Sequence, residues 1–181
     1  MARQITSEFW LKSCSKLRIF SDLKGGTGPL VYPGGFVYLF SLLYYATDHG
    51  ANIARAQVIF AVFYLIHLGT VFTLYQKVKL KMPPILLLFM SLSGYRIHSI
   101  FSLRLFNDGP AMTLFYLSVL CFVSQNWKLG SVLYSLSVSV KMNTLLAAPG
   151  LLVVYLRNLN LQHAILNLAI CAAVQGNLSK K

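Results

Sequence analysis

AQVIFAVFYLIHLGTVFTLY, residues 56–75, is the stretch of sequence that decides the fold. It contains no Asp, Glu, Lys or Arg, and its only polar side chains are Gln57, His67 and hydroxyl groups. The hydrocarbon core of a bilayer is about 30 Å thick, and a helix needs roughly 20 apolar residues to cross it. This stretch therefore predicts a membrane-spanning α-helix.

Six further long stretches lack Asp, Glu, Lys and Arg, and with the first they make up most of the chain. They are residues 25–47, 82–95, 109–127, 129–140, 142–156 and 158–179. Only 11% of the residues are charged, whereas a soluble domain has about 25%, and the mean hydropathy is +0.63. The composition predicts an all-α fold, a polytopic transmembrane helix bundle with some short or broken helices.

Turn signals divide these stretches into expected helices. Residues 36–46 follow a loop rich in glycine and proline, and Pro83–Pro84 and Pro110 each suit the start of a helix. Asn126, Trp127 and Lys128 read as an interfacial turn after the helix from Pro110. The last helix is expected over residues 161–174.

Two neighbouring stretches, residues 129–140 and 144–156, are each too short for a simple crossing. Lys141 and Asn143 separate them. They form either one long helix kinked near Pro149 or two half-helices around a polar break. Irregular backbone at membrane depth is tolerated only where protein or water covers it, so a break would line a cavity.

The net charge of +12 comes from 16 Lys and Arg against four Asp and Glu. In a soluble protein this excess would favour nucleic-acid binding. Here the cations are spread between the apolar stretches, as in helix ends whose side chains reach lipid headgroups. We therefore expect membrane lipids as partners, and no nucleic acid.

Metal and cofactor signals are weak. Cys14, Cys121 and Cys171 lack the spacing of a metal site, and His67 and His163 each stand alone on an apolar stretch. The glycine-rich stretch at residues 25–35 lacks the Gly-Lys-Ser/Thr ending of a phosphate-binding loop, so turn chemistry explains its glycines. We expect no metal and no cofactor.

Three regions follow from this pattern. Residues 1–24 form a basic arm, amphipathic or disordered; residues 25–176 form a transmembrane helical domain; and residues 177–181 form a short polar tail.

Three blocks of the chain resemble one family. They are LKGGTGPLVYPGGFVYLF at residues 23–40, GYRIHSIFSLRLFND at residues 94–108 and SLSVSVKMNTLLAAPGLL at residues 135–152. Their order and spacing are similar to those of the dolichyl-phosphate-mannose-dependent α-1,3-mannosyltransferase of asparagine-linked glycosylation.

The resemblance implies a partial GT-C-type membrane domain, multi-pass in the endoplasmic reticulum membrane, with inverting, metal-independent chemistry. It implies dolichyl-phosphate mannose as donor and the lipid-linked oligosaccharide carrying five mannoses as acceptor, in protein N-glycosylation. Gly26 stands where the family usually has an aspartate, and the first 20 residues lack the family's initial membrane helix. The family also continues through further crossings, which predicts that this chain is a truncated form with little or no activity alone.

Transfer with inversion requires a carboxylate that takes a proton from the acceptor hydroxyl, and groups that stabilise the leaving phosphate. Asp108 lies in a family-like block and is the candidate catalytic residue, although an ion pair with Arg104, four residues earlier, is the alternative role. The candidate substrate and lipid-phosphate ligands are Arg96, His98, Arg104, Asn107, Lys141 and Asn143. Anchoring at the headgroups is the alternative for the basic members.

The charge pattern and the family orientation disagree. If residues 36–46 and 56–75 both cross the bilayer, residues 1–35 and the basic cluster of Lys77, Lys79 and Lys81 share one side. The positive-inside rule then places both in the cytosol, whereas the family has the glycine-rich stretch in the lumen. A second interpretation of the chain is a non-catalytic membrane protein that associates with the full-length enzyme or with other membrane helices.

Overall fold

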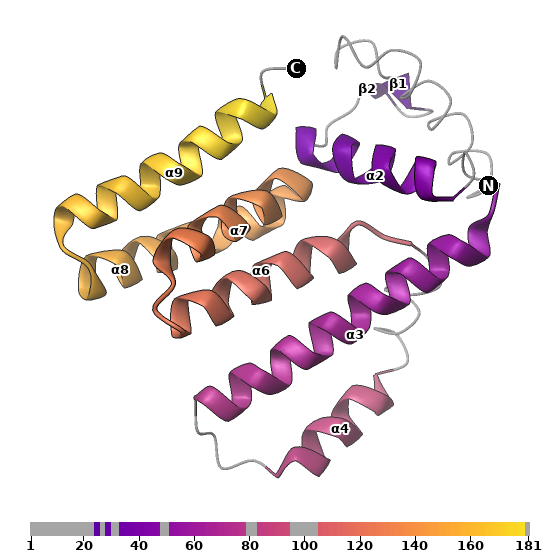
Figure 1. Cartoon of the computed structure of the whole chain (residues 1–181), viewed down its shortest axis with the longest axis horizontal. Helices are drawn as coiled ribbons and strands as arrows, with labels where there is room; N and C mark the ends of the chain where they lie inside the picture. Colours follow the sequence, from indigo (N-terminus) through magenta and orange to yellow (C-terminus); the bar gives the residue numbers. More distant parts are fainter. Residues whose placement is uncertain are drawn as a thin grey trace.

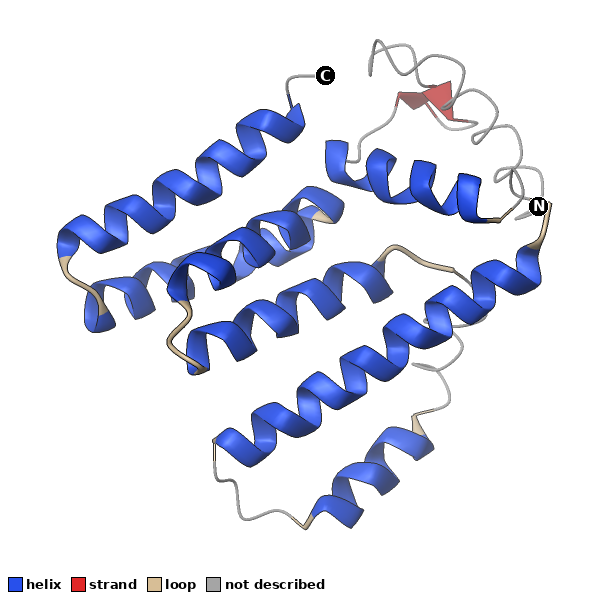
Figure 2. Ribbon diagram, in the orientation of Figure 1, coloured by secondary structure: helices blue, strands red, loops and turns tan. Residues whose placement is uncertain are grey.

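The computed structural model describes residues 24–25, 28–29, 33–47, 51–78, 83–94 and 105–179. Within these ranges the fold is all-α, as predicted, apart from one short antiparallel pair of strands, β1 (Lys24–Gly25) and β2 (Gly28–Pro29). The helices, in chain order, are α2 (Gly34–Ala46), α3 (Ile53–Lys77), α4 (Pro84–Ser93), α6 (Asp108–Val123), α7 (Trp127–Val140), the 3₁₀ helix η3 (Met142–Ala147), α8 (Ala148–Asn158) and α9 (Leu161–Ser179). Figure 2 shows, in tan, the short loops between α6 and α7 and between α8 and α9.

The longest of the described helices, α3, confirms the helix predicted at residues 56–75. It has 25 residues, about 37 Å at 1.5 Å per residue. The Asn52 side chain caps it by accepting a hydrogen bond from the Arg55 backbone N–H at 3.3 Å. Among the described residues, α3 is the one helix whose length and composition suit a membrane crossing, and α2 and α6 are shorter apolar helices.

The central helix is α7, which packs against α2, α6 and α9. Four serines of α7 are buried: Ser131, Ser135, Ser137 and Ser139. The Ser137 hydroxyl donates to the Ala111 carbonyl of α6 at 2.8 Å, and the Ser135 hydroxyl donates to the Cys171 carbonyl of α9 at 2.9 Å. Small hydroxyl residues let helix backbones approach closely and add hydrogen bonds between them, as in membrane helix pairs.

The chain breaks between α7 and α8. After Val140 the backbone of Lys141 is extended (φ −147°, ψ 124°), and η3 then leads into α8. Pro149 lies in the first turn of α8, where its missing N–H costs nothing. Of the two alternatives at this point, the structure has the polar break, and the single kinked helix is wrong.

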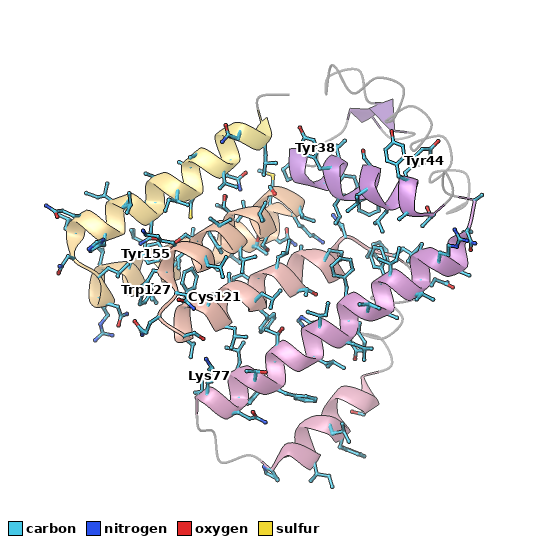
Figure 3. The ribbon with its side chains drawn as sticks, in the orientation of Figure 1. Tyr38, Tyr44, Lys77, Cys121, Trp127 and Tyr155 are labelled. Carbon is cyan, nitrogen blue, oxygen red and sulfur yellow. The ribbon has the colours of Figure 1, made fainter. Side chains whose placement is uncertain are left out.

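The helix bundle has two opposite ends. At one, the Lys77 ammonium donates to the Ser124 hydroxyl at 2.6 Å, next to the α6–α7 turn; we call this the Lys128 end, with Lys77, Lys128 and Arg157. At the other, α6 begins at Asp108 and α7 stops at Val140; we call this the Asp108 end. Figure 3 shows Lys77, Cys121 and Trp127 far from Tyr38 and Tyr44 of α2.

Helix α2 lies across the Asp108 end (Figure 1). Its first turn packs against Ser139 near the end of α7, and its last residue leads into Thr47, whose carbonyl accepts from the Asn52 N–H just before α3. The helix predicted at residues 36–46 is confirmed as α2, whose 13 residues extend about 20 Å. Gly34 and Lys77 lie at opposite ends of the bundle, and the membrane side of each stays a prediction.

Other helix boundaries differ from the predicted ones by a few residues. Trp127 and Lys128 lie in the first turn of α7, while the turn itself is at Gln125, whose φ is +63°. Helix α9 runs to Ser179, five residues past the expected end at residue 174 and into the predicted tail. The predicted arm, residues 1–24, falls outside the described residues except for Lys24.

Candidate functional site

The three family-like blocks meet at the Asp108 end. Gly35 belongs to the first block, Asn107 and Asp108 end the second, and residues 135–141 begin the third. A β-carbon on Gly35 would lie 2.2 Å from the Ser139 hydroxyl oxygen. This contact is closer than any side chain allows, so the glycine permits the first and third blocks to touch.

Asp108 and Lys141 form an ion pair at this end. The Lys141 ammonium donates to the Asp108 carboxylate, joining the start of α6 to the residue that follows α7. The side chains are partly exposed, 33% for Asp108 and 21% for Lys141. The carboxylate also lies in the first turn of α6, where the helix dipole favours a negative charge. Arg104, the partner considered from the sequence, lies outside the described residues.

Among the candidate residues that the structure describes, Asn107 is the most buried, with 6% of its surface exposed. Its side-chain nitrogen is enclosed and has no hydrogen-bond partner among the described residues. Its side chain does not cap α6, and two residues earlier Leu105 has a φ of +52°. Buried polar atoms are almost always paired, and this amide nitrogen next to Asp108 is a donor that can bind an oxygen atom of a ligand.

The remaining candidates are less well placed. Asn143 is exposed on η3, two residues beyond Lys141. Arg96, His98 and Arg104 lie outside the described residues. The structure thus brings together Asn107, Asp108 and Lys141, which combine a carboxylate, an ammonium and an amide donor. This set can hold a phosphate oxygen beside a group able to accept a proton.

A second polar cluster joins α7, α8 and α9 and was not anticipated from the sequence. The Ser131 hydroxyl lies 2.5 Å from the Tyr155 hydroxyl and donates to the Asn167 side-chain oxygen at 3.2 Å. The Gln175 amide donates to the Ser135 carbonyl at 2.6 Å. The sequence signal that could have predicted these contacts is the spacing of Ser131, Ser135 and Ser139, which lie four residues apart on one helix face. Since its members satisfy one another, the cluster serves packing.

Within the described ranges, no group of three His, Cys, Asp or Glu side chains lies close enough together to hold a metal ion.

Comparisons with known proteins identify relatives for nearly the whole chain. The sequence model described as "ALG3 protein" matches residues 12–181. The Dol-P-Man:Man(5)GlcNAc(2)-PP-Dol alpha-1,3-mannosyltransferase of Mus musculus is 53% identical over 86% of this chain and 35% of its own length. The Homo sapiens protein of the same name is 51% identical over the same shares, and the Arabidopsis thaliana one is 45% identical over 87% of this chain and 35% of its own.

This chain spans about a third of the length of the curated relatives that it matches. No solved structure matches it.

Proposed function

Because this chain belongs to the ALG3 protein family, we propose that it forms part of a membrane site for mannosyl transfer. The donor is dolichyl-phosphate mannose, and the acceptor is the lipid-linked oligosaccharide carrying five mannoses, which is extended in α-1,3 linkage in protein N-glycosylation. The observation that carries the proposal is the meeting of the three family-like blocks at the Asp108–Lys141 pair.

The three residues have distinct proposed roles. As the bond between mannose and phosphate breaks, negative charge grows on the dolichyl phosphate, and the Lys141 ammonium stabilises it. The unpaired Asn107 amide donates to an oxygen of the same group. Asp108 holds Lys141 in place and is the candidate that takes the proton of the acceptor hydroxyl. Arg96, His98, Arg104 and Asn143 remain further proposed ligands.

We propose a multi-pass placement of GT-C type in the endoplasmic reticulum membrane. Helix α3 is long enough to cross alone, and α6 packs against α3, α7 against α6, and α9 against α7. The Lys128 end carries Lys77, Lys128 and Arg157, so the positive-inside rule assigns it to the cytosol. The Asp108 end then faces the lumen together with Gly34, in agreement with the family orientation, because α2 does not cross.

A chimera tests this function most directly. Residues 22–173 replace the matching segment of the mouse relative, and the chimera is expressed in cells that lack the enzyme. We expect mannose transfer to the five-mannose oligosaccharide, lost in Lys141→Met and retained in Lys128→Gln at the opposite end. Full transfer in both Lys141→Met and Asp108→Asn would reject the proposed site.

A second function is favoured by the exposed apolar faces of α8 and α9. Large apolar side chains stand exposed there, among them Val153, Leu156, Leu161 and Ile165. Such faces suit contact with other membrane helices, and a non-catalytic chain would use them to bind the full-length enzyme. Co-purification of the two proteins from detergent in equal amounts would favour this function; a monodisperse monomer would count against it.

A further inference from the structure

A pocket opens at the Lys128 end, far from the proposed transfer site. It holds about 570 Å³ between the α6–α7 turn, the start of α7 and the first turns of α9. The lining residues are Gln125, Asn126, Trp127, Lys128, Leu129, Leu159, His163, Leu166 and Asn167. Because Lys128 lies in the first turn of α7 and Lys141 follows its end, nearly the whole of that helix separates the pocket from the transfer site.

The polar side of the pocket is suited to an anion. Lys128 and His163 line it together with the side-chain amides of Gln125 and Asn126, and no acidic residue does. In the described ranges the single carboxylate is Asp108, which pairs with Lys141 at the other end. An ammonium, an imidazole and amide donors without a carboxylate match the oxygens of a phosphate ester.

The other side of the pocket is apolar and continues onto the surface of the bundle. Trp127 packs its ring near those of Phe122 and Tyr155, with centroids 5.9 Å and 6.2 Å away, as Figure 3 shows for Trp127 and Tyr155. Leu129 and Leu166 are exposed beside it. Tryptophan and lysine together are typical of the level of lipid headgroups.

We propose that this pocket binds the phosphate of an anionic membrane lipid between Lys128 and His163, with the acyl chain lying over Leu166 on α9. The shared chemistry is a phosphate ester, for which a soluble phosphate is the other source; the apolar wall favours the lipid. The proposal rests on the membrane placement proposed above, and it does not depend on mannosyl transfer.

Tryptophan quenching by brominated lipids tests the pocket. The chain has two tryptophans, so Trp10→Phe leaves Trp127 as the reporter. This variant is inserted into nanodiscs of phosphatidylcholine and phosphatidylserine in which either one or the other carries bromine. We expect stronger quenching when phosphatidylserine carries it. Lys128→Gln should weaken the apparent affinity for phosphatidylserine about tenfold, because it removes a charge-assisted hydrogen bond to the phosphate.

Arg157→Gln is the matched control, because Arg157 is exposed at the same end but does not line the pocket. It should leave the quenching unchanged, as should Lys128→Arg. Equal quenching by the two brominated lipids, or equal loss in Lys128→Gln and Arg157→Gln, would overturn the proposal. Relief of quenching by added inorganic phosphate would identify a soluble phosphate as the ligand and reject the lipid.

Recovery of the chain in the nanodisc fraction is scored separately from quenching. Failure to enter nanodiscs would reject both the membrane placement and the pocket. Insertion without selective quenching would reject only the lipid pocket. The transfer site would still be tested by the chimera.

Discussion

At the scale of single residues, Gly35 sets how closely α2 approaches α7. A β-carbon there would lie 2.2 Å from the Ser139 hydroxyl oxygen and 2.8 Å from the Ser139 carbonyl carbon. Rotation of the serine can relieve the first contact but not the second, because the second is backbone. The glycine is thus a packing requirement of the Asp108 end as well as part of a turn-rich stretch.

We expect Gly35→Ala to lower the free energy of unfolding by about 1–3 kcal/mol, the usual cost of overpacking. Titration with denaturant in detergent micelles measures it. Gly69→Ala in α3 is the control, because nothing lies within 4 Å of the β-carbon it would add, and it should be neutral or stabilising. Equal stability of the two variants would contradict the close approach.

The Asp108–Lys141 pair has different expected effects on stability and on transfer. Both side chains are partly exposed, so we expect either single substitution to cost at most about 1 kcal/mol of stability. In the chimera, Lys141→Met should slow transfer by roughly 100-fold, as for loss of a group that stabilises developing charge.

Asp108→Asn separates its two proposed roles. If Asp108 only positions Lys141, Asp108→Asn combined with Lys141→Met should be no slower than Lys141→Met alone. If Asp108 is the base, the double variant should lose a further factor of about 100 or more. Single-turnover transfer rates measure both cases.

At the scale of elements, α3 has the properties of a helix in contact with lipid. It exposes Val58, Val62, Leu65 and Ile66 over its middle turns. In water this face would be costly, whereas hydrocarbon accommodates it. A charged substitution on this face therefore tests whether α3 lies in the bilayer.

We expect Leu65→Arg to reduce membrane insertion of the chain, since arginine at the centre of a spanning helix costs about 2.5–3.5 kcal/mol on the insertion scale. Gln76→Arg, one residue before the end of α3, should have little effect, because its side chain can reach the headgroups. A microsomal insertion assay compares the two variants, and equal insertion would argue against a spanning α3.

The positions of the helices were easier to predict from the sequence than the contacts between them. Long apolar stretches and the starts at Pro83–Pro84 and Pro110 placed α3, α4 and α6 within a few residues, because helix starts are local signals. The Asp108–Lys141 pair was missed, although both residues were singled out, because it depends on how α6 packs against α7. Residues 96, 98 and 104 remain predictions.

The course of α2 was missed for a related reason. Its composition resembles that of a spanning helix, and only the contact of Gly35 with Ser139 shows that it starts at the same end at which α3 begins. Contacts between helices of this kind produce no periodic pattern of residues that a sequence analysis could detect. The side that the charge rule assigns to the glycine-rich stretch depends on whether α2 crosses the bilayer, so it stays a prediction.

At the scale of the whole molecule, the two ends of the bundle differ in charge. Lys77, Lys128 and Arg157 lie at one end, while Arg55, Lys141 and Asp108 lie at the other. We expect an N-glycosylation acceptor placed in a flexible insert after Gly25 to be modified in cells, and the same insert after Gln125 to remain unmodified. Sensitivity to endoglycosidase H measures both. The reverse pattern would place Asp108 in the cytosol.

Because α2 lies across the end at which it starts, the helices α6, α7, α8 and α9 run alternately away from that end and back to it. The last turns of α9, beyond the Gln175 contact with Ser135, return to α2 and pack beside it. The described chain thus starts and finishes on one face, as a hairpin does. Split fluorescent halves fused near Lys24 and after Lys181 would share a compartment and reassemble without the bilayer between them.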